Sequence, residues 1–384
     1  MDFTKLEKYM GKLSDYGIPA CDIIIYKDHE LVYRTMAGYS DIKKTKHVSD
    51  EDLYHLYSNT KLFTVVSGMQ LIEQGKLKFD DPVSKYLPDF KNLTYSTRKG
   101  IMPVDEPMQI YHLFTMTSGI TYDPSPSIDK IIKSSKGLAD TKEIVSALAK
   151  EPLAFQPGKR FCYGRSHDVL GAVVEVVSNM KLSEYFRKNI AEPLGMKYIT
   201  FNYDDNYAKE HLSELYEYDS VEQKANPWSD KEKPSHRFTL NYESGGAGLI
   251  CSTDDYALLL DALANGGVGK NRKRILNEDS ITQMKEPRLN YLQQSQFIIS
   301  HCKKGYGYGL GVRTMIDKGY GARTPIGEFG WDGMTGGYGL VDTENHIAIC
   351  YMQNVSGCNY AWYNVFPETR DMIYDILGIE DSEE

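Results

Sequence analysis

The chain has 384 residues, 41% hydrophobic and 25% charged, which is enough to bury a large core in an ordinary globular protein. Its net charge of -9 argues against a nucleic-acid partner, which would require a basic face. The N-terminal segment has no apolar signal-like stretch and no apolar run is long enough to span a bilayer, so we expect a cytoplasmic protein without a membrane partner.

The first sixty residues predict a helix followed by strands. Leu6, Met10 and Leu13 lie on one face of an N-terminal helix. The apolar segments 23–26 and 31–34 flank Asp28-His29 and predict a β-hairpin whose first strand is covered on both faces. The six cysteines are scattered without metal-site spacing, so they are expected to be free, buried thiols.

Helical patterns dominate the middle of the chain, and strands return near its end. Helices are predicted from Ser58 to Gly75 and over residues 107–116, 141–150, 167–178, 182–192 and 254–265. Strands are predicted over residues 308–312, 337–341 and 346–352, followed by a last helix that carries Met372, Ile373 and Ile376 on one face. This order predicts an α+β fold, with one antiparallel sheet built from both chain termini and flanked by helices. We expect a sheet-containing domain over residues 1–85 and 240–384 and a mainly helical domain over 86–239.

The pattern Ser-x-x-Lys occurs six times, and context separates one occurrence from the rest. The matches are Ser40/Lys43, Ser58/Lys61, Ser96/Lys99, Ser127/Lys130, Ser178/Lys181 and Ser300/Lys303. Only Ser58 opens a long apolar helix, where the unpaired N–H groups of the first turn favour developing negative charge. Lys61 lies one turn further on the same face, and burial would lower the pKa of its ammonium so that the amine could accept the Ser58 proton. From spacing alone, an N-cap serine and a surface lysine are the simpler interpretation.

Two further segments could complete such a site. Tyr163 stands between the turn Gln156-Pro157-Gly158 and a strongly apolar helix, where its hydroxyl can be exposed. Near the Lys61 ammonium the pKa of this phenol would drop, which would make a phenolate base plausible. The glycine-rich segment Phe329–Gly337 contains Trp331-Asp332-Gly333, and its small residues allow a substrate to approach the backbone. Judged alone, a structural tyrosine is the simpler interpretation of Tyr163, and a glycine-rich hairpin is the simpler interpretation of Phe329–Gly337.

Together these segments resemble the serine β-lactamase and penicillin-binding-protein-like superfamily, in its class C-like branch with family VIII carboxylesterases and D-stereospecific aminopeptidases. The resemblance rests on Ser58-Asn59-Thr60-Lys61, Thr115–Gly119, Phe155–Gly158, Tyr163, Asp168–Gly171, Glu192–Met196, Gly245–Leu249 and Trp331-Asp332-Gly333. It implies a β-lactamase/transpeptidase-like fold with a cleft between the sheet and the helical region.

By this resemblance, Ser58 is the acylated nucleophile, and Lys61 with Tyr163 forms its general-base machinery. The oxyanion hole would consist of the backbone N–H groups of Ser58 and Met334. No metal or organic cofactor is implied.

The departures from the family pattern concern the substrate. Class C enzymes carry Tyr-x-Asn and a Lys-Thr-Gly type sequence, whereas this chain has Tyr163-Gly164-Arg165 and Trp331-Asp332-Gly333. A β-lactam carboxylate would lose its usual cation and meet Asp332, unless Arg165 compensates. We therefore assign Arg165, Trp331, Asp332 and Gly333 to substrate binding, and we expect Arg165 and Asp332 to pair across the empty cleft.

The resulting hypothesis is a serine hydrolase that forms an acyl-enzyme on Ser58, most plausibly from a small carboxylic ester. A β-lactamase or a D-amino-acid amidase or peptidase with the same residues is the first alternative. The second alternative is a catalytically silent, penicillin-binding-like sensor, since Arg165 departs from the usual Asn. The partner is a small-molecule ester or amide, and the sequence makes no prediction of oligomeric state.

Overall fold

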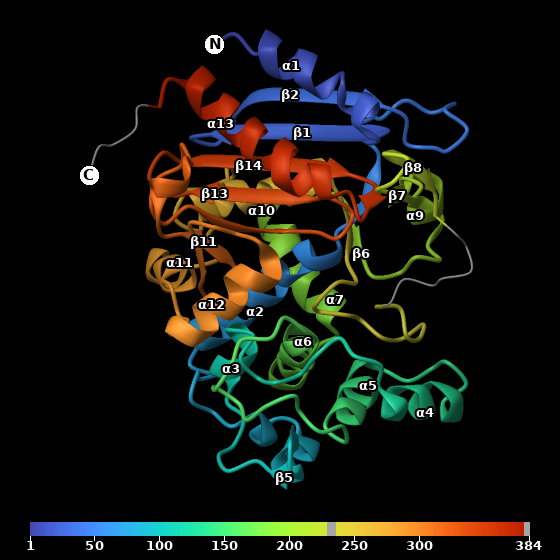
Figure 1. Ribbon diagram of the computed structural model, residues 1–384, viewed down its shortest axis with the longest axis vertical. Helices are drawn as coiled ribbons and strands as arrows, with labels where there is room; N and C mark the ends of the chain where they lie inside the picture. Colours follow the sequence, from blue (N-terminus) through green and yellow to red (C-terminus); the bar gives the residue numbers. More distant parts are fainter. Residues whose placement is uncertain (229–235, 380–384) are drawn as a thin grey trace.

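A computed structural model describes residues 1–228 and 236–379, which fold around a seven-stranded antiparallel sheet (Figure 1). From edge to edge its strands are β10 (Tyr306–Tyr308), β11 (Arg313–Met315), β12 (Phe329–Asp332), β13 (Tyr338–Asp342), β14 (Ile347–Gln353), β1 (Ala20–Lys27) and β2 (Glu30–Gly38). The two chain ends meet where β1 pairs with β14, with Cys21 opposite Gln353 and Lys27 opposite Ile347. The predicted α+β sheet built from both termini is confirmed.

Strand β1 is apolar throughout because its alternate side chains enter two different cores. Ile23 and Ile25 pack with the cluster that includes α1 (Thr4–Met10) and α13 (Phe366–Leu377) on one face of the sheet. Ile24 and Tyr26 belong to the cluster on the other face, where α10 (Thr253–Ala264) packs against β1 and β14. Both faces of the central strands are therefore covered, as the sequence predicted.

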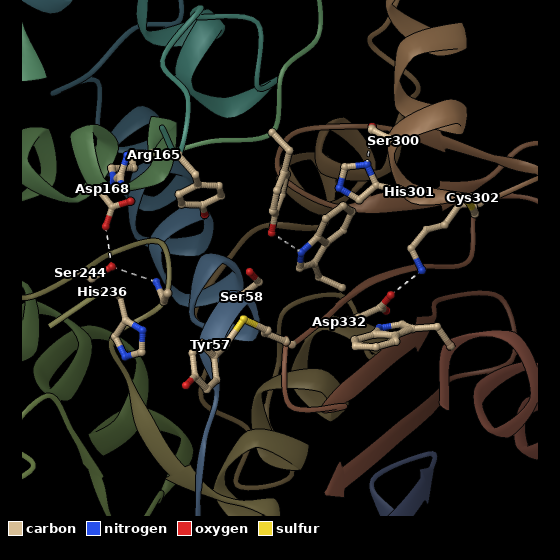
Figure 2. Close-up of a pocket in the computed structure, with 18 of the residues that line it drawn as sticks. Tyr57, Ser58, Arg165, Asp168, His236, Ser244, Ser300, His301, Cys302 and Asp332 are labelled. Atoms are coloured by element: carbon tan, nitrogen blue, oxygen red, sulfur yellow. Dashed lines mark hydrogen bonds and ion pairs between the residues drawn. The ribbon is translucent and has the colours of Figure 1, made fainter. Parts of the chain in front are cut away.

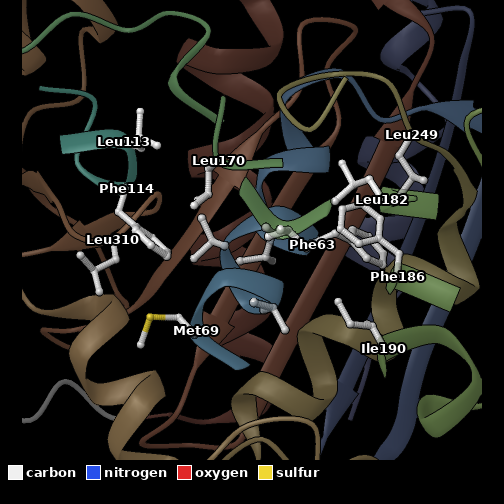
Figure 3. Packing of buried hydrophobic residues seen from close by; sticks show 14 of the residues in the cluster. Phe63, Met69, Leu113, Phe114, Leu170, Leu182, Phe186, Ile190, Leu249 and Leu310 are labelled. Carbon is white, nitrogen blue, oxygen red and sulfur yellow. The ribbon is translucent and has the colours of Figure 1, made fainter. Parts of the chain in front are cut away.

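Helix α2 (Thr60–Glu73) runs through the larger core, and every side chain from Thr60 to Leu71 is buried. It packs against α6 (Ser166–Ser178) and α7 (Leu182–Phe186), and Figure 3 shows Phe63 of α2 beside Phe186 of α7. The two ring centroids are 5.5 Å apart. Gly68 allows Phe114 to approach the helix closely, since a Cβ there would lie 2.6 Å from the ring. The helix is thus held rigidly from its first turn onward.

The other elements surround this core. The helices are α3 (Ile110–Phe114), α4 (Pro126–Ser134), α5 (Thr141–Leu148), α8 (Glu192–Leu194), α9 (Asn206–His211), α11 (Glu278–Lys285) and α12 (Tyr291–His301). The small sheets contain β3 (Leu53–His55), β9 (Ile250–Ser252) and β6 (Ile199–Thr200), then β15 (Val355–Ser356), β7 (Tyr216–Asp219) and β8 (Lys224–Pro227), and last β4 (Thr94–Thr97) and β5 (Gly100–Pro103). In Figure 1, α3 to α6 lie at the end opposite α1 and α13. A single hydrophobic cluster joins both parts, so the domain boundaries proposed from the sequence stay a prediction.

One secondary-structure expectation was largely wrong, and one helix was missed. Of the segment 308–312 only Tyr308 lies in a strand, β10, and residues 309–312 connect β10 to β11, because Gly311 adopts a left-handed φ of +76° and reverses the chain. Helix α12 was not predicted, although its C-terminal end borders the cleft described below. All six cysteines are free thiols, but the predicted burial is wrong for two of them, because Cys162 is half-buried and Cys302 is exposed. Within the described residues, none of the helices combines the length and hydrophobicity needed to cross a bilayer.

Truncation of Phe186 tests how strongly α2 is held in place. Phe186→Ala should lower the free energy of unfolding by about 3–5 kcal/mol, since a fully buried ring that packs against Phe63 is replaced by a cavity. Urea unfolding measures this, with Leu138→Ala as control because Leu138 is 55% exposed. A loss as small as that of the control would show that α7 does not support α2.

Candidate active site

Ser58 lies in a tight turn that leads directly into α2. Residues Tyr57–Asn59 form one turn of 3-10 helix between β3 and α2. Tyr57 has a φ of +44°, a left-handed conformation that is strained for a bulky residue and that turns the chain sharply before Ser58. The surrounding packing therefore fixes the Ser58 hydroxyl at the head of a buried helix, as predicted.

Lys61 is fully buried and directs its amino group at Ser58. Its Nζ atom lies 2.6 Å from the carbonyl oxygen of Gly246, 3.0 Å from Ser58 Oγ and 3.1 Å from the hydroxyl of Tyr122. Burial lowers the pKa of Lys61 to about 7, although the carboxylate of Asp168 works in the opposite direction. The expected drop in the Lys61 pKa is thus supported, and a neutral amine is accessible near neutral pH.

Asp168 on α6 organises the loop that receives Lys61. Its Oδ1 atom accepts hydrogen bonds from Tyr242 Oη at 2.7 Å, Ser244 Oγ at 2.5 Å and the backbone N–H of Gly246 at 3.3 Å. A Cβ on Gly246 would lie 2.6 Å from Asp168 Oδ2, so glycine allows the loop to pass this close. The carbonyl of Gly246 is consequently held where it accepts from Lys61.

Tyr163 lies beside both Ser58 and Lys61, but its ionisation differs from the expectation. The Lys61 Nζ atom is 4.7 Å from the centroid of the Tyr163 ring, and Trp331 Nε1 donates to the Tyr163 hydroxyl at 2.8 Å. Burial raises the pKa of the Tyr163 phenol well above its ordinary value, and hydrogen bonding to Ser58 and Trp331 only partly opposes this. The predicted drop in the pKa is therefore wrong, and Tyr163 is a neutral phenol at neutral pH.

Arg165 and Asp332 do not pair, which contradicts the expected ion pair across the cleft. Figure 2 shows Arg165 and Asp332 on opposite sides of Ser58. The Arg165 guanidinium donates to the backbone carbonyls of Thr121 at 3.0 Å and Asp123 at 3.1 Å and lies over the Tyr122 ring. Asp332 instead forms ion pairs with cationic side chains on its own side of the cleft. Two backbone carbonyls close to Arg165 replace the carboxylate that the sequence suggested.

The partners of Asp332 are Lys303 and Arg313. Lys303 Nζ contacts Asp332 Oδ2, and Arg313 Nη1 lies 3.1 Å from Asp332 Oδ1. Burial works to raise the pKa of Asp332, but the two cations outweigh it and the net pKa is lowered. Asp332 is therefore an anion with a cation on each carboxylate oxygen.

The turn after β12 brings Met334 next to the Ser58 turn. Thr335 Oγ1 donates to the His55 carbonyl at 3.2 Å, and a Cβ on Gly333 would lie 2.6 Å from the Leu56 carbonyl oxygen. Only glycine permits this approach. Among the described residues, neither the N–H of Ser58 nor that of Met334 has a hydrogen-bond acceptor, so both remain available.

These groups border a cleft of about 540 Å³. Aromatic rings dominate its lining: Tyr57, Tyr122, Tyr163, Phe238, Tyr242, Trp331, Trp362 and Tyr363. His301 also borders it, and burial lowers the pKa of this imidazole to about 4, so it is neutral at physiological pH. The cleft therefore suits an apolar small molecule that reaches Ser58.

The residues assigned to the site from the sequence come together in the structure: Lys61 is buried directly behind Ser58, and the cleft is lined by Ser58, Tyr163, Arg165, Trp331, Asp332, Gly333 and Met334. Sequence reasoning missed Tyr122 and Lys303. Tyr122 follows the segment Thr115–Gly119 by three residues, which was a usable signal. Lys303 belongs to a Ser-x-x-Lys match that leads into Gly305 instead of opening a helix, and no local pattern indicated that it would reach the cleft.

Comparison with known proteins gives a consistent family. The family model described as Beta-lactamase matches residues 4–359. A D-alanyl-D-alanine carboxypeptidase-like protein of Escherichia coli (strain K12) is 24% identical over 375 residues, which cover 91% of this chain and 82% of that protein.

Two solved structures share the fold over nearly the whole chain. EstCE1, described as a hydrolase with promiscuous acyltransferase activity, has a TM-score of 0.79 at 24% identity, covering 97% of this chain and 98% of its own. The simvastatin synthase LovD of Aspergillus terreus has a TM-score of 0.81 at 19% identity, covering 99% and 100%. The β-lactamase/transpeptidase-like fold implied by the sequence is thereby confirmed.

Removal of Arg165 should destabilise the wall of the cleft that carries Tyr122. Arg165→Met deletes the hydrogen bonds to the carbonyls of Thr121 and Asp123 and should lower the free energy of unfolding by about 1–3 kcal/mol. Arg187→Met is the control in urea unfolding, because Arg187 forms only an exposed ion pair. Equal stabilities of the two variants would contradict a structural role for Arg165.

Proposed function

This chain belongs to the β-lactamase family and is a serine hydrolase, and on that premise we propose that it hydrolyses small carboxylic esters through an acyl-enzyme on Ser58. The observation that carries the proposal is the 3.0 Å contact between Ser58 Oγ and a fully buried Lys61 at the head of α2. A serine hydroxyl needs an adjacent base to attack a carbonyl, and burial lowers the pKa of this amine to about 7, so that a large share of it is neutral near neutral pH.

In the first step, Ser58 Oγ attacks the ester carbonyl while its proton passes to Lys61. A charged ammonium offers three donors and no lone pair. The neutral amine can donate to Gly246 and Tyr122 and still accept the proton of Ser58 through its lone pair. The negative charge on the carbonyl oxygen would be held by the backbone N–H groups of Ser58 and Met334.

The leaving alcohol then needs a proton as the carbon–oxygen bond breaks. Tyr163 supports this step because its raised pKa keeps the phenol protonated and Trp331 already donates to its oxygen. The phenol can give its proton to the departing alkoxide and regain one from the Lys61 ammonium. Water then attacks the acyl-enzyme carbonyl by the same steps in reverse order, which releases the acid and restores Ser58.

The charge distribution of the cleft favours a neutral ester over a β-lactam. In the described part of the chain, Arg165 and Lys303 are the cationic residues that line the cleft. Arg165 is only 8% exposed and donates to two backbone carbonyls, and Lys303 is paired with Asp332, so neither is an exposed, unpartnered cation for a substrate carboxylate. The aromatic lining supports binding of an apolar acyl or alcohol group.

An amidase or peptidase that uses the same residues is the alternative that the carboxypeptidase-like relative favours. A peptide substrate with a free C-terminus ends in a carboxylate, which meets the same lack of an exposed, unpartnered cation. A panel of nitrophenyl esters, D-amino-acid amides and nitrocefin separates these activities. Turnover of the amides or nitrocefin above that of the esters would replace the ester assignment.

The nucleophile assignment predicts covalent trapping. Wild-type protein should gain the mass of one fluorophosphonate adduct in intact-protein mass spectrometry, whereas Ser58→Ala should gain none. Lys61→Arg should lower ester kcat/KM by at least about 10³-fold, since a guanidinium cannot accept the Ser58 proton. Lys130→Arg, in another Ser-x-x-Lys match, is the matched control and should leave kcat/KM unchanged. A trapped Ser58→Ala protein, or no adduct at all, would contradict acylation of Ser58.

The Lys61 pKa predicts the pH dependence of the reaction. Because burial lowers this pKa to about 7, the amine is protonated and inactive below pH 7 and becomes a competent base above it. Ester kcat/KM should therefore rise about tenfold per pH unit on the acidic side and level off above about pH 7. Circular dichroism at each pH confirms that the protein stays folded. A profile that is flat from pH 5 to 8 would argue against Lys61 as the base.

A further inference from the structure

A lysine lies on the cleft wall opposite Arg165, and its charge is already paired with a carboxylate. Lys303 follows α12, where Cys302 adopts a left-handed φ of +52° and turns the chain back toward the cleft. Its side chain is 17% exposed and lines the same cleft as Ser58 and Trp331. Figure 2 shows the ion pair between this lysine and Asp332 at the cleft wall.

The charges behind this wall balance in two pairs. Arg313, which is 1% exposed, lies 3.3 Å from Glu328 Oε1 and donates to the Gly339 carbonyl at 3.0 Å. Glu328 also accepts from the Tyr306 hydroxyl at 2.9 Å. Arg313 also contacts Asp332 at 3.1 Å, but its other partners lie behind the wall, whereas Asp332 and Lys303 form the pair next to the cleft. Together the two cations and two anions carry no net charge.

A purely structural ion pair is the simpler explanation, but position argues against it. A buried salt bridge adds little stability over apolar residues of the same size, because both ions must be desolvated. This pair is also placed where a ligand at Ser58 would meet it. A lysine on that wall would attract an anionic group, and Asp332 both neutralises it and repels such a group.

We propose that Asp332 is a specificity-determining residue that masks Lys303 and thereby excludes carboxylate-bearing substrates from the cleft. The proposal rests on the function proposed above, since it concerns which esters reach Ser58. Loss of the Asp332 charge uncovers a binding site for a carboxylate at Lys303. Loss of the Lys303 charge leaves Arg313 as the remaining cationic partner of Asp332, so the wall next to the cleft becomes more negative and the exclusion is strengthened.

Two esters of the same size test this, 3-carboxyphenyl acetate and its neutral twin 3-carbamoylphenyl acetate. The measured quantity is the ratio of their kcat/KM values, anionic over neutral, at one pH. Asp332→Asn should raise this ratio about tenfold or more, and Lys303→Met should lower it, because like charges in a desolvated site strongly disfavour binding. The double variant should return the ratio close to that of the wild type.

Asp254→Asn is the control for the change in net charge. Asp254 also pairs with an arginine, Arg34, but on β2 at the far edge of the sheet, so its variant should leave the ratio unchanged. A ratio that is equal in wild type, Asp332→Asn and Lys303→Met would overturn the proposal. So would a rise in Asp332→Asn that persists in the double variant, because Lys303 would then not be the anion site.

Failure of ester hydrolysis is distinguished by a binding measurement that needs no turnover. The matched 3-carboxyphenyl- and 3-carbamoylphenylboronic acids form a bond from boron to an active serine oxygen, and calorimetry gives their dissociation constants. If the wild type hydrolyses neither ester, the proposed function fails. In that case the masking of Lys303 by Asp332 is supported if Asp332→Asn binds the carboxylate boronate about tenfold more tightly and the carbamoyl boronate no more tightly than the wild type does. The masking is contradicted if the affinities for both boronates change equally or if neither boronate binds.

Discussion

The burial of the Lys61 amino group at the head of α2 is the constraint on which the rest of the site depends. A buried ammonium without partners is very unfavourable, so the fold must supply acceptors or allow the group to lose its charge. The Gly246 carbonyl serves as such an acceptor. Its loop can approach this closely only because residues 245 and 246 are glycines, since a Cβ at either position would collide with α6. The contact thus ties together the helix of the nucleophile, the loop before β9 and Asp168. The buried lysine therefore requires glycine at these two loop positions.

The charged groups around the cleft are satisfied by the protein itself. Arg165 binds the carbonyls of one wall, and Asp332 binds a cation on each carboxylate oxygen at the other. From Arg313 the polar contacts continue behind the sheet through Glu328 to Tyr306. Such groups are fixed before a substrate arrives, so the cleft offers it mostly aromatic surface and the two free N–H groups beside Ser58.

Periodic segments could be predicted from the sequence, and loop contacts could not. The β1–β2 hairpin and α2 follow from apolar patterns of period 2 and 3.6, and α2 singled out Ser58 and Lys61. Tyr122 and Lys303 reach the cleft from loops, where the sequence has no periodic pattern that would indicate which way a side chain points. The prediction of an Arg165–Asp332 ion pair was wrong because two opposite charges in separate motifs give no information about the distance between them. In the structure, backbone carbonyls lie next to Arg165 instead. The prediction of a phenolate was wrong because burial of Tyr163 raises its pKa more than the surrounding groups lower it.

Burial has complementary effects on the two proton-transferring groups. It disfavours every charged form, so it lowers the pKa of Lys61 and raises that of Tyr163. The lysine becomes a neutral base and the tyrosine a protonated acid, which are the two states that the proposed acylation needs. Trp331 fits this division of roles. Its indole N–H holds the phenol oxygen without adding charge, whereas a lysine in its place would stabilise a phenolate. The departure from the usual third motif is therefore coupled to the protonation state of Tyr163 as well as to the choice of substrate.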